Sequence, residues 1–410
     1  MKEYLIGERL GHSYSVAIHN AFGGKEYALK EIAREDLKGF IEKREFGGLN
    51  VTIPYKQSVM PLLDEISPLA ERIGAVNTVV NRGGRLYGYN TDYDGFARLA
   101  ERAGVRFAGR RVLVLGTGGT SRTVQTVCRD AGAASVETVS RSGKLNYDNV
   151  YERSETEIVV NTTPVGMYPE SEGRAVDLSK FPRLCGALDV IYNPLRTNFV
   201  LQARSLGVPA EGGLAMLVAQ GARARELFDG VKIGEETFEA VVRAMQRRSE
   251  NLVLIGMPGA GKSTVGREAA RALNRPFFDC DEEIVKETGL SIEEIFASGG
   301  EVRFRAAEKS VIGELAKKSG AVIAAGGGAV KDEANVTAFK RNGKIMYLKR
   351  DTELLALKGR PLSKNRETVR KLYEERRGLY EAAADRTIEN DGDLKSATVA
   401  VLAAFTGEEI

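Results

Sequence analysis

Two glycine-rich loops constrain this chain more than any other feature of its sequence. The first lies in RRVLVLGTGGTSR (residues 110–122) and the second in NLVLIGMPGAGKST (residues 251–264). Each follows an apolar run typical of a buried parallel strand and opens into a helical pattern. In that setting, backbone N–H groups and the helix N-terminus face a phosphate. The first loop suits a dinucleotide and the second a nucleoside triphosphate, which predicts two enzymes in series within one chain.

Composition restricts the kind of protein and its surroundings. The 410 residues allow two to four domains at roughly 100–200 residues each. A net charge of +3 gives no general attraction to nucleic acid or membranes. The sequence has no run of about 18 apolar residues that would predict a transmembrane helix, and the N-terminus lacks the apolar core of a signal peptide. We expect a cytoplasmic protein, a monomer or a homodimer, whose partners are small molecules.

Cysteine and histidine usage excludes several kinds of metal site. The three cysteines, Cys128, Cys185 and Cys280, are too widely spaced for a metal pattern or a disulfide framework. We expect all three to be inert core residues in a reducing compartment. With only two histidines, His12 and His19, the chain cannot build a histidine-rich metal site.

The order of apolar runs and helical patterns indicates an α/β fold. From residue 110, strand, glycine loop, helix and strand follow one another, and further short strands are expected at 157–163 and 185–192. This is the βαβ signature of a doubly wound parallel sheet. Helical patterns between residues 214 and 248 are expected to fold back on the N-terminal part. The βα pattern then restarts, so the polar stretch 247–250 is the predicted main boundary.

The first glycine loop carries a cofactor signal beyond its glycines. Twenty-five residues after Gly116, at the end of the next predicted strand, comes Arg141. An NAD enzyme usually has an acidic residue there for the ribose 2′-hydroxyl, whereas Arg accommodates a 2′-phosphate. The pattern therefore predicts NADP. The alternatives are a G-x-G turn in a plain loop and a solvated surface arginine.

Polar residues also occur where loops of the first ninety residues meet strands. Ser13 and Ser15 alternate, so an extended segment would aim both hydroxyls the same way. Four more follow in short polar motifs: Thr52, Lys56, Asn77 and Asp92. Each alone is explained by a cap or a turn. Together they would line a pocket for a small polyhydroxy acid.

The second loop satisfies the pattern G-x-x-x-x-G-K-[ST] between Gly256 and Ser263. In this pattern Lys262 reaches the β- and γ-phosphates and Ser263 ligates Mg²⁺. Asp279 and Asp281, at i and i+2 at the end of a predicted strand, would face the nucleotide from one side. One would serve Mg²⁺ and the other substrate hydroxyls. The alternative is an acidic cluster at a helix N-terminus.

A helical pattern after this loop places charges on one face. Glu301, Arg305 and Glu308 fall at i, i+4 and i+7, so the carboxylates can hold the guanidinium in a fixed pose. A surface salt-bridge ladder is the alternative. The run VIAAGGGAV then ends a strand in three glycines, 326–328, which allow a ligand to approach the backbone closely.

Across residues 1–248 the segments GERLGHSYSVAIHN, GLNVTIPYK, IGAVNTV, YGYNTD, GTGGTSR, NTTPVGM, DVIYNP and GGLAMLVAQ resemble shikimate dehydrogenase, in order. The resemblance implies that Lys56 and Asp92 are the catalytic pair. It implies substrate contacts by Ser13, Ser15, Thr52, Asn77, Tyr192 and Gln220. It implies NADP(H) contacts by Gly116, Thr117, Gly118, Gly119, Thr120, Ser140, Arg141, Ser142, Val190 and Gly213.

Residues 251–410 resemble shikimate kinase, through the phosphate loop, the acidic pair, GRPLS and EERRGLY. The resemblance implies ATP contacts by Gly259, Ala260, Gly261, Lys262, Ser263, Thr264 and Arg360. It implies shikimate contacts by Asp281, Arg305, Gly327 and Arg376, with Mg²⁺ held by Ser263 and Asp279.

These resemblances imply three domains. They are an α/β substrate-binding domain over 1–93, completed by helices at 214–248, an NADP-binding Rossmann domain over 94–213, and a P-loop kinase domain over 249–410. The kinase domain is expected to have a parallel sheet like that of nucleoside monophosphate kinases. The implied reactions are NADPH-dependent reduction of 3-dehydroshikimate to shikimate, and MgATP-dependent phosphorylation of shikimate to shikimate 3-phosphate.

Two other interpretations are open. One is a quinate/shikimate dehydrogenase that uses NAD, joined to a kinase for another small polyol; Arg141 argues against it. The other is a regulatory sensor built from inactive copies of these domains. Such a protein should have lost Lys56, Asp92, Lys262 or Asp279, and all four are present.

Overall fold

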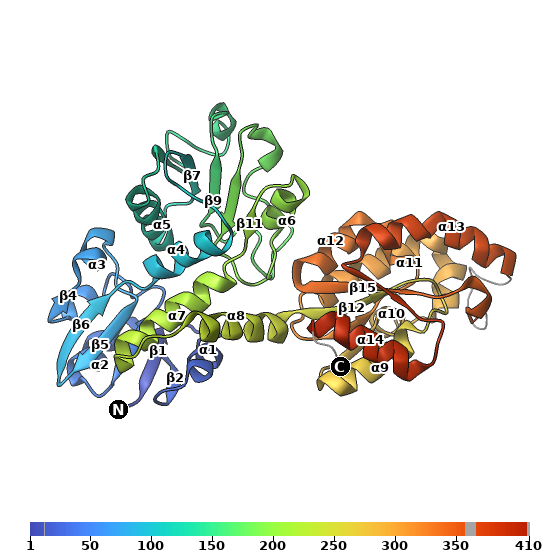
Figure 1. Cartoon of the computed structure of the whole chain (residues 1–410), viewed down its shortest axis with the longest axis horizontal. Helices are drawn as coiled ribbons and strands as arrows, with labels where there is room; N and C mark the ends of the chain where they lie inside the picture. The colour runs from blue at the N-terminus through green and yellow to red at the C-terminus, as the bar shows by residue number, and fades with distance from the viewer. Residues whose placement is uncertain (12, 357–365, 408–410) are drawn as a thin grey trace. The chain divides into compact units, whose positions relative to one another are not determined.

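The structure of the protein is a computed structural model that describes residues 1–11, 13–356 and 366–407. The chain divides into two compact units, Met1–Gln246 and Arg247–Ile410. Each unit is built around parallel β-strands with helices on their faces (Figure 1). The expected α/β class, with a Rossmann-like part and a P-loop part, is confirmed.

The first unit begins with a mixed six-stranded sheet of order β2-β1-β3-β5-β6-β4. Its strands are β1 (Glu3–Gly7), β2 (Tyr27–Glu31), β3 (Gly48–Val51), β4 (Glu65–Ile66), β5 (Thr78–Arg82) and β6 (Arg85–Tyr89). The helices of this part are α1 (Ser15–Phe22), α2 (Leu37–Lys43), α3 (Pro68–Ile73) and α4 (Asp92–Arg102). Short 3-10 turns are η1 (Arg34–Asp36) and η2 (Met60–Leu62).

A second sheet of the same unit is wholly parallel, with order β11-β10-β9-β7-β8. Its strands are β7 (Arg111–Leu115), β8 (Ser135–Val139), β9 (Ile158–Asn161), β10 (Gly186–Asp189) and β11 (Ala210–Glu211). The other elements are α5 (Gly119–Asp130), η3 (Val150–Glu152), η4 (Leu178–Lys180), α6 (Asn198–Ser205), α7 (Leu214–Asp229) and α8 (Glu235–Ser249).

Burial explains why these segments become central strands and a central helix. Residues 112–115 of β7 are at most 2% exposed, as expected for a parallel strand covered on both faces. Helix α7 packs against α4 and α1 and contributes Ala215 and Met216 to the core below the second sheet. One helix therefore connects the two sheets, and it carries Gln220, one of the predicted substrate residues.

The second unit has a five-stranded parallel sheet of order β13-β14-β12-β15-β16. Its strands are β12 (Asn251–Ile255), β13 (Phe277–Asp279), β14 (Val322–Ala324), β15 (Gly343–Lys349) and β16 (Arg386–Glu389). Its helices are α9 (Lys262–Leu273), α10 (Cys280–Thr288), α11 (Ile292–Ala316), η5 (Ala329–Lys331), α12 (Glu333–Asn342), η6 (Thr352–Leu354), α13 (Arg366–Ala383) and α14 (Leu394–Thr406).

Helix α11 shows how local sequence sets direction in this unit. It starts with a capping box, in which the Ser291 side chain accepts from Glu294 N and the Glu294 carboxylate accepts from Ser291 N. The helix bends at Gly300, whose φ of 63° and ψ of −162° are not helical. The bend separates an acidic first segment from the segment that carries Arg305 and Glu308.

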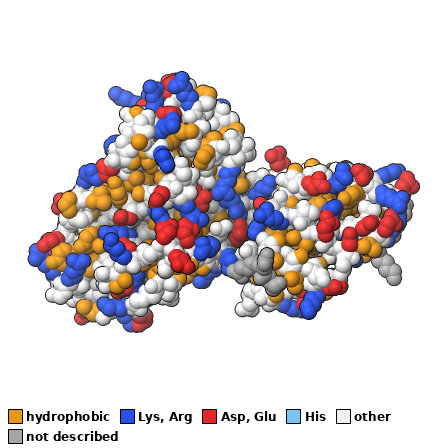
Figure 2. Space-filling model, viewed as in Figure 1, with side chains coloured by type: hydrophobic (Ala, Val, Ile, Leu, Met, Phe, Trp, Pro, Cys, Tyr) orange, Lys and Arg blue, Asp and Glu red, His pale blue; other side chains and the backbone are white. Residues whose placement is uncertain are grey.

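The surface and the cysteines give two further results. Acidic and basic side chains are interspersed over the face seen in Figure 2. Within the described residues, no helix is long and apolar enough to cross a membrane. Cys128 and Cys280 are buried, but Cys185 is exposed. The expectation of three core cysteines was therefore wrong for Cys185. This residue lies one position before the buried strand β10 and is itself exposed to solvent.

Candidate active sites

A polar pocket of about 280 Å³ lies in the first unit, between the first sheet and helices α1 and α7. Every predicted substrate and catalytic residue of this unit lines it, namely Ser13, Ser15, Thr52, Lys56, Asn77, Asp92, Tyr192 and Gln220. These residues come from positions as far apart as 13 and 220 in the chain. The structure therefore brings together a set that the sequence offers only as scattered motifs.

Lys56 and Asp92 form an ion pair in this pocket. The Lys56 Nζ lies 2.6 Å from Asp92 Oδ2, and the two side chains are 21% and 7% exposed. Asp92 is the first residue of α4, so the positive end of the helix dipole stabilises its carboxylate. Both groups line the pocket, and the carboxylate fixes the position of the ammonium group, which suits a proton donor.

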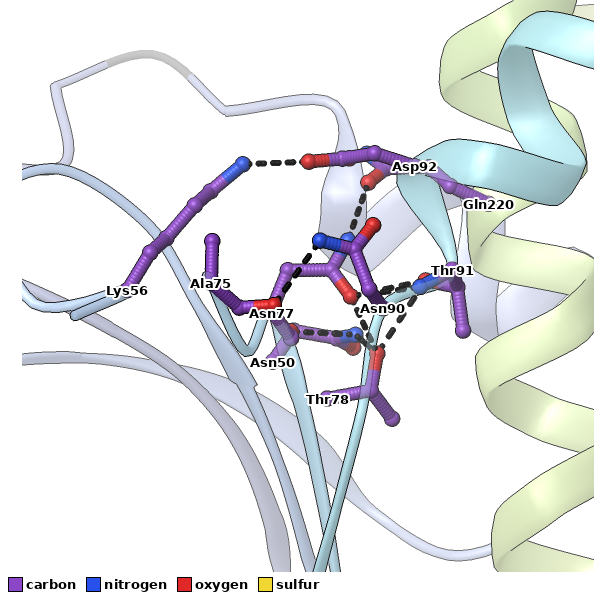
Figure 3. Close-up of polar contacts among 9 residues, drawn as sticks. All are labelled: Asn50, Lys56, Ala75, Asn77, Thr78, Asn90, Thr91, Asp92 and Gln220. Carbon is purple, nitrogen blue, oxygen red and sulfur yellow. Dashed lines mark hydrogen bonds and ion pairs between the residues drawn. The ribbon is translucent and has the colours of Figure 1, made fainter. Parts of the chain in front are cut away.

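Asn77 is held by hydrogen bonds on both sides of its amide (Figure 3). Its Oδ1 accepts from the backbone N–H of Thr91 at 2.7 Å, and its Nδ2 donates to Gln220 Oε1 at 3.3 Å. Because both ends of the amide are satisfied, its orientation is fixed. Asn77 and Gln220 therefore present one rigid polar edge to a ligand, built from the start of β5 and from α7.

Sequence reasoning missed several further pocket residues, among them Asn50 and His19. Asn50 Nδ2 donates to Thr78 Oγ1 at 3.1 Å, so it supports the Asn77 edge from below. His19 is stacked on Tyr27, with ring centroids 3.8 Å apart. A polar residue in the middle of the apolar β3 pattern was the available signal for Asn50.

His19 belongs to a buried ionic cluster. The Arg225 guanidinium lies 3.3 Å from His19 Nδ1 and 2.5 Å from Glu3 Oε2, and all three residues are at most 3% exposed. Burial, reinforced by the Arg225 charge, lowers the pKa of His19 to about 3. The imidazole is therefore neutral at physiological pH. Since Arg225 can only donate, His19 Nδ1 accepts and Nε2 carries the proton.

The predicted extended arrangement of Ser13 and Ser15 is wrong. Ser15 is the first residue of α1, and its backbone N–H donates to Ser13 Oγ at 3.2 Å. A serine that bonds the backbone two residues on favours a turn over a strand. Both hydroxyls still reach the pocket, because the turn and the first helical residue lie at its rim.

The first glycine loop has the strand–loop–helix geometry of a dinucleotide site. β7 ends at Leu115, Gly116 has φ +103°, and α5 starts at Gly119. A Cβ on Gly118 or Gly119 would meet no atom within 4 Å, so the space in front of the helix N-terminus is open to a ligand. These features fit a pyrophosphate on the N-terminus of α5.

The other predicted NADP residues lie at strand ends of the same sheet. Ser140, Arg141 and Ser142 follow β8, and both Arg141 and Ser142 are exposed. No carboxylate of the described residues forms an ion pair with Arg141. Val190 follows β10, and a Cβ on Gly213 would clash with the Val190 carbonyl oxygen, so only glycine fits there. The Arg141 charge is thus available to a 2′-phosphate.

The second unit has a pocket of about 530 Å³ over the carboxyl ends of β12, β13 and β14. Most predicted kinase residues line it, namely Gly259, Gly261, Lys262, Ser263, Thr264, Asp279, Asp281, Arg305, Gly327 and Arg376. Ala260 does not, because its side chain is fully buried under the loop. The predicted Arg360 lies outside the described residues.

Lys262 and Ser263 lie in the phosphate loop at the edge of this pocket. The Lys262 Nζ donates to the carbonyl oxygens of Gly256 and Met257 at 2.9 and 3.0 Å, which holds it across its own loop. The Ser263 Oγ lies 2.5 Å from Asp279 Oδ2. A hydroxyl and a carboxylate in contact suit Mg²⁺, which takes few protein ligands and completes its shell with water and phosphate.

Asp281 is not on the strand end that the sequence predicted. β13 ends at Asp279, which caps α10 by accepting from the backbone N–H of Asp281 at 3.0 Å. Asp281 is therefore in the first turn of α10, and the alternative of an acidic helix N-terminus describes the local structure. Both carboxylates still line the pocket.

Two arginines face the pocket from α11 and α13. Arg305 pairs with Glu301 at 2.9 Å and with the buried Glu308 at 2.6 Å, so the predicted carboxylate clamp is present. A Cβ on Gly328 would clash with the Arg305 guanidinium, which places that group against the glycine run. Arg376 donates to the carbonyl oxygen of Gly327 at 3.1 Å. The two guanidinium groups suit a carboxylate ligand.

An apolar wall of this pocket was missed from the sequence. Phe296 and Phe304 stack with ring centroids 5.0 Å apart and line the pocket beside Arg305. They come from the two segments of α11 on either side of the Gly300 bend. The bend brings the two rings together. The spacing of the two residues in the sequence does not predict this contact.

Comparisons with known proteins find a family match in each unit. The model of the shikimate dehydrogenase substrate binding domain matches residues 5–79, and that of shikimate kinase matches residues 258–405. A "Shikimate dehydrogenase (NADP(+))" of Clostridium perfringens (strain 13 / Type A) is 38% identical over 265 residues, which are 60% of this chain and 98% of that protein.

Solved structures are similar over the same 60% of the chain. Shikimate 5-dehydrogenase from Thermus thermophilus, in complex with NADP(H) and shikimate, is 31% identical with a TM-score of 0.54 and is covered over 99% of its length. Quinate dehydrogenase from Corynebacterium glutamicum, in complex with NAD, is 29% identical with a TM-score of 0.55 and is also covered over 99%. Since the chain spans nearly all of a relative that is 38% identical and then continues into a second matched domain, it belongs to the shikimate dehydrogenase family and carries a shikimate kinase domain behind it.

Proposed function

We propose that the chain reduces 3-dehydroshikimate to shikimate with NADPH in its first unit and phosphorylates shikimate with MgATP in its second. The observation that carries this proposal is that each unit has its own pocket, which brings predicted reactive groups together. The Lys56–Asp92 pair lies in one, and Lys262, Ser263 and Asp279 lie in the other. The order of the units along the chain is the order of the two reactions.

In the first unit, the side chains of the pocket bind and orient a polyhydroxy carbonyl compound. Bound NADPH supplies the hydride. Lys56 gives a proton to the oxygen that develops negative charge, and Asp92 keeps the ammonium group in place. The Asn77–Gln220 edge holds the ring hydroxyls, because its amide groups have fixed donors and acceptors.

We expect NADP to be preferred to NAD because a positively charged residue follows β8. Arg141 is exposed, and no acidic residue stands in its place to bind a ribose 2′-hydroxyl. The relatives include proteins named for NADP and two solved with NAD, so the family alone does not decide the cofactor. The residue at position 141 is what favours NADP in this chain.

In the second unit, the protein contributes positioning and charge. Lys262 and the backbone of the phosphate loop hold the β- and γ-phosphates, and Ser263 and Asp279 hold Mg²⁺, which neutralises charge on the transferring group. Arg305 and Arg376 hold the shikimate carboxylate. Asp281 lies at the same pocket and binds the hydroxyl that receives the phosphate.

A coupled assay tests both activities on one sample. The protein receives 3-dehydroshikimate, NADPH and MgATP, and shikimate 3-phosphate is measured together with NADPH oxidation. Omission of ATP should leave shikimate as the product. NADPH oxidation without any phosphorylated product, or the reverse, would contradict one half of the proposal while leaving the other.

We further propose the three-part division of the chain at residues 93, 213 and 248, with α7 and α8 completing the substrate-binding part. The packing of α7 on α1 and α4 supports it. The proposal includes a reducing cytoplasm, which suits free thiols such as the exposed Cys185, and a monomer or homodimer as the working form.

A further inference from the structure

The sheet order of the second unit determines where the nucleoside end of ATP must lie; the reasoning rests on the proposed kinase function. The phosphate loop follows β12, the middle strand of the order β13-β14-β12-β15-β16. The acceptor residues at the ends of β13 and β14 and on α11 lie to one side. The transferring phosphate must face them. The ribose and base therefore extend the other way, over the ends of β15 and β16.

Arg350 stands at this place. It is the first residue after β15, and its side chain is half-buried. Its Nη1 lies 3.9 Å from the position that a Cβ on Gly261 would occupy, so the guanidinium reaches the last glycine of the phosphate loop. β12 and β15 are adjacent strands, as Figure 1 shows for this unit.

The Arg350 guanidinium has no anionic partner among the residues that the structure describes. Its Nε is buried and, within those residues, has no hydrogen-bond partner. The preceding residue differs, since Lys349 Nζ lies 2.8 Å from Glu389 Oε1. A guanidinium cannot lose its proton, so a half-buried unpaired one is costly unless a ligand supplies the negative charge.

The surroundings of Arg350 are rigid. Asn390 follows β16, is 3% exposed, and donates through Nδ2 to the carbonyl oxygen of Ala260 at 2.5 Å. Its backbone N–H donates to Lys349 O at 2.8 Å, and Asp351 N donates to Asp391 Oδ1 at 2.8 Å. The phosphate loop and the ends of β15 and β16 are thus tied together. A cation on this platform is pre-organised for a ligand that lies on the loop.

We propose that Arg350 is a nucleotide-binding residue of the kinase site, whose guanidinium donates to the α-phosphate of ATP. The unpaired charge, the reach to Gly261 and the side of the sheet opposite the acceptor all select this part of the nucleotide. Its role is affinity for the nucleotide and not the transfer step, because the γ-phosphate lies toward Lys262 and Arg305.

The test compares Arg350→Ala with Lys349→Ala in the full chain. Loss of a charge-assisted hydrogen bond predicts a rise in KM for ATP of about tenfold to a hundredfold in Arg350→Ala. The KM for shikimate, kcat at saturating ATP and dehydrogenase activity should stay within about twofold of the wild type. Lys349→Ala should leave all four values unchanged, because its ammonium group already has a protein partner.

ADP binding measured by calorimetry gives a readout that needs no turnover. ADP keeps the α-phosphate, so its Kd should rise by the same factor as the KM for ATP. Arg350→Lys keeps a charge without the planar fork and should fall between the wild type and Arg350→Ala; it also serves if the alanine variant does not fold. An ADP affinity within about twofold of the wild type in both variants would overturn the proposal. Wild-type protein that binds ADP but does not phosphorylate shikimate would instead count against the proposed function alone.

Discussion

At the scale of single residues, reactive groups of both pockets are held by defined protein partners. Lys56 has Asp92, and Ser263 has Asp279. Such pairs fix an atom to within a few tenths of an ångström, which is what proton or phosphoryl transfer requires. The consequences of removing one partner are therefore local and can be measured on one reaction while the other serves as control.

Lys56→Ala should lower the dehydrogenase kcat/KM by about 10²- to 10⁴-fold, the range for loss of a positioned acid–base group. Kinase activity on added shikimate should be unchanged, because Lys56 lies in the other unit. Steady-state rates of both reactions on one preparation measure this. Reduction of 3-dehydroshikimate at nearly the wild-type rate would remove Lys56 from the catalytic role.

Arg141→Asp should reverse the cofactor preference toward NADH. The new carboxylate repels a 2′-phosphate and accepts a hydrogen bond from a free 2′-hydroxyl. The kcat/KM for NADPH and for NADH, determined on wild type and variant, give the ratio that checks it. Arg111→Asp on the same sheet is a matched control, since Arg111 is exposed at the opposite end of β7. An unchanged ratio in Arg141→Asp would place this residue outside the cofactor site.

At the scale of elements, sequence reasoning succeeds where the signal is local and fails where it is not. The strand–loop–helix units around Gly116 and Gly261 follow from short contiguous patterns, and both are present. The clamp of Arg305 by Glu301 and Glu308 follows from helical spacing. These features need no knowledge of the rest of the chain.

The failures have equally definite causes. Asp281 lies on a helix because Asp279 caps it, and capping competes with a strand pattern only three residues long. The His19–Arg225 contact joins residues 206 positions apart, so no local pattern contains it. The place of Arg350 likewise depends on the order of strands in a sheet, which the sequence alone does not supply.

Helix α11 carries a prediction about Arg305. Arg305→Lys should raise the KM for shikimate about tenfold, because Lys lacks the fork that binds a carboxylate through two hydrogen bonds. Arg305→Ala should do so and also destabilise the second unit, since Glu308, which is 1% exposed, is left without its cation. Kinase kinetics and thermal unfolding of both variants separate the two effects. Equal losses in the dehydrogenase reaction would indicate general unfolding instead.

The contact of His19 on α1 with Arg225 on α7 predicts how the stability of the first unit depends on pH. The pKa of His19 is about 3 in the fold against 6.5 when unfolded, so the unfolded state binds the extra proton between these values. Stability from this group is complete above pH 6.5 and is lost as pH falls, by up to about 1.4 kcal/mol per pH unit. His19→Gln should remove this slope. Calorimetric unfolding at about pH 7, 6 and 5, on either side of the unfolded pKa, measures it for variant and wild type.

A second buried group, Asp189, also changes stability with pH. The measured quantity must therefore be the difference in stability between wild type and His19→Gln at each pH. Burial raises the pKa of Asp189 to about 6 from 3.8, so the folded state binds its proton first and stability from this group rises as pH falls through 6. Asp189 is the same in both proteins and cancels. His12→Gln, at the chain's other histidine, is the control. A stability difference between wild type and His19→Gln that does not change with pH would contradict the assignment.

At the scale of the whole molecule, the two units each have a sheet, a core and a pocket of their own. A unit of that kind is expected to fold independently. The boundary between the two units, at residues 246 and 247, falls inside helix α8, which ends at Ser249. Phe238 and Val242 of that helix belong to the core of the first unit, whereas its last residues are bonded to the second.

The position of a cut should therefore decide the stability of the kinase piece. Pieces 1–246 and 247–410 should each be folded and active in one reaction. A kinase piece that starts at Asn251 loses the Ser249 carbonyl oxygen, which accepts from Gly320 N at 3.0 Å and from the buried Asn342 Nδ2 at 3.1 Å. Asn342 Nδ2 keeps its bond to Lys318 O at 2.9 Å, so it loses one of its acceptors, whereas the Gly320 N–H loses the Ser249 oxygen. A hydrogen bond lost from such a part-buried site costs roughly 1–3 kcal/mol. The 251–410 piece should thus unfold at a lower temperature than 247–410 while keeping the same KM for shikimate. Equal unfolding temperatures would mean that residues 247–250 are only a connection, and an inactive 247–410 piece would mean that the kinase needs the first unit to fold.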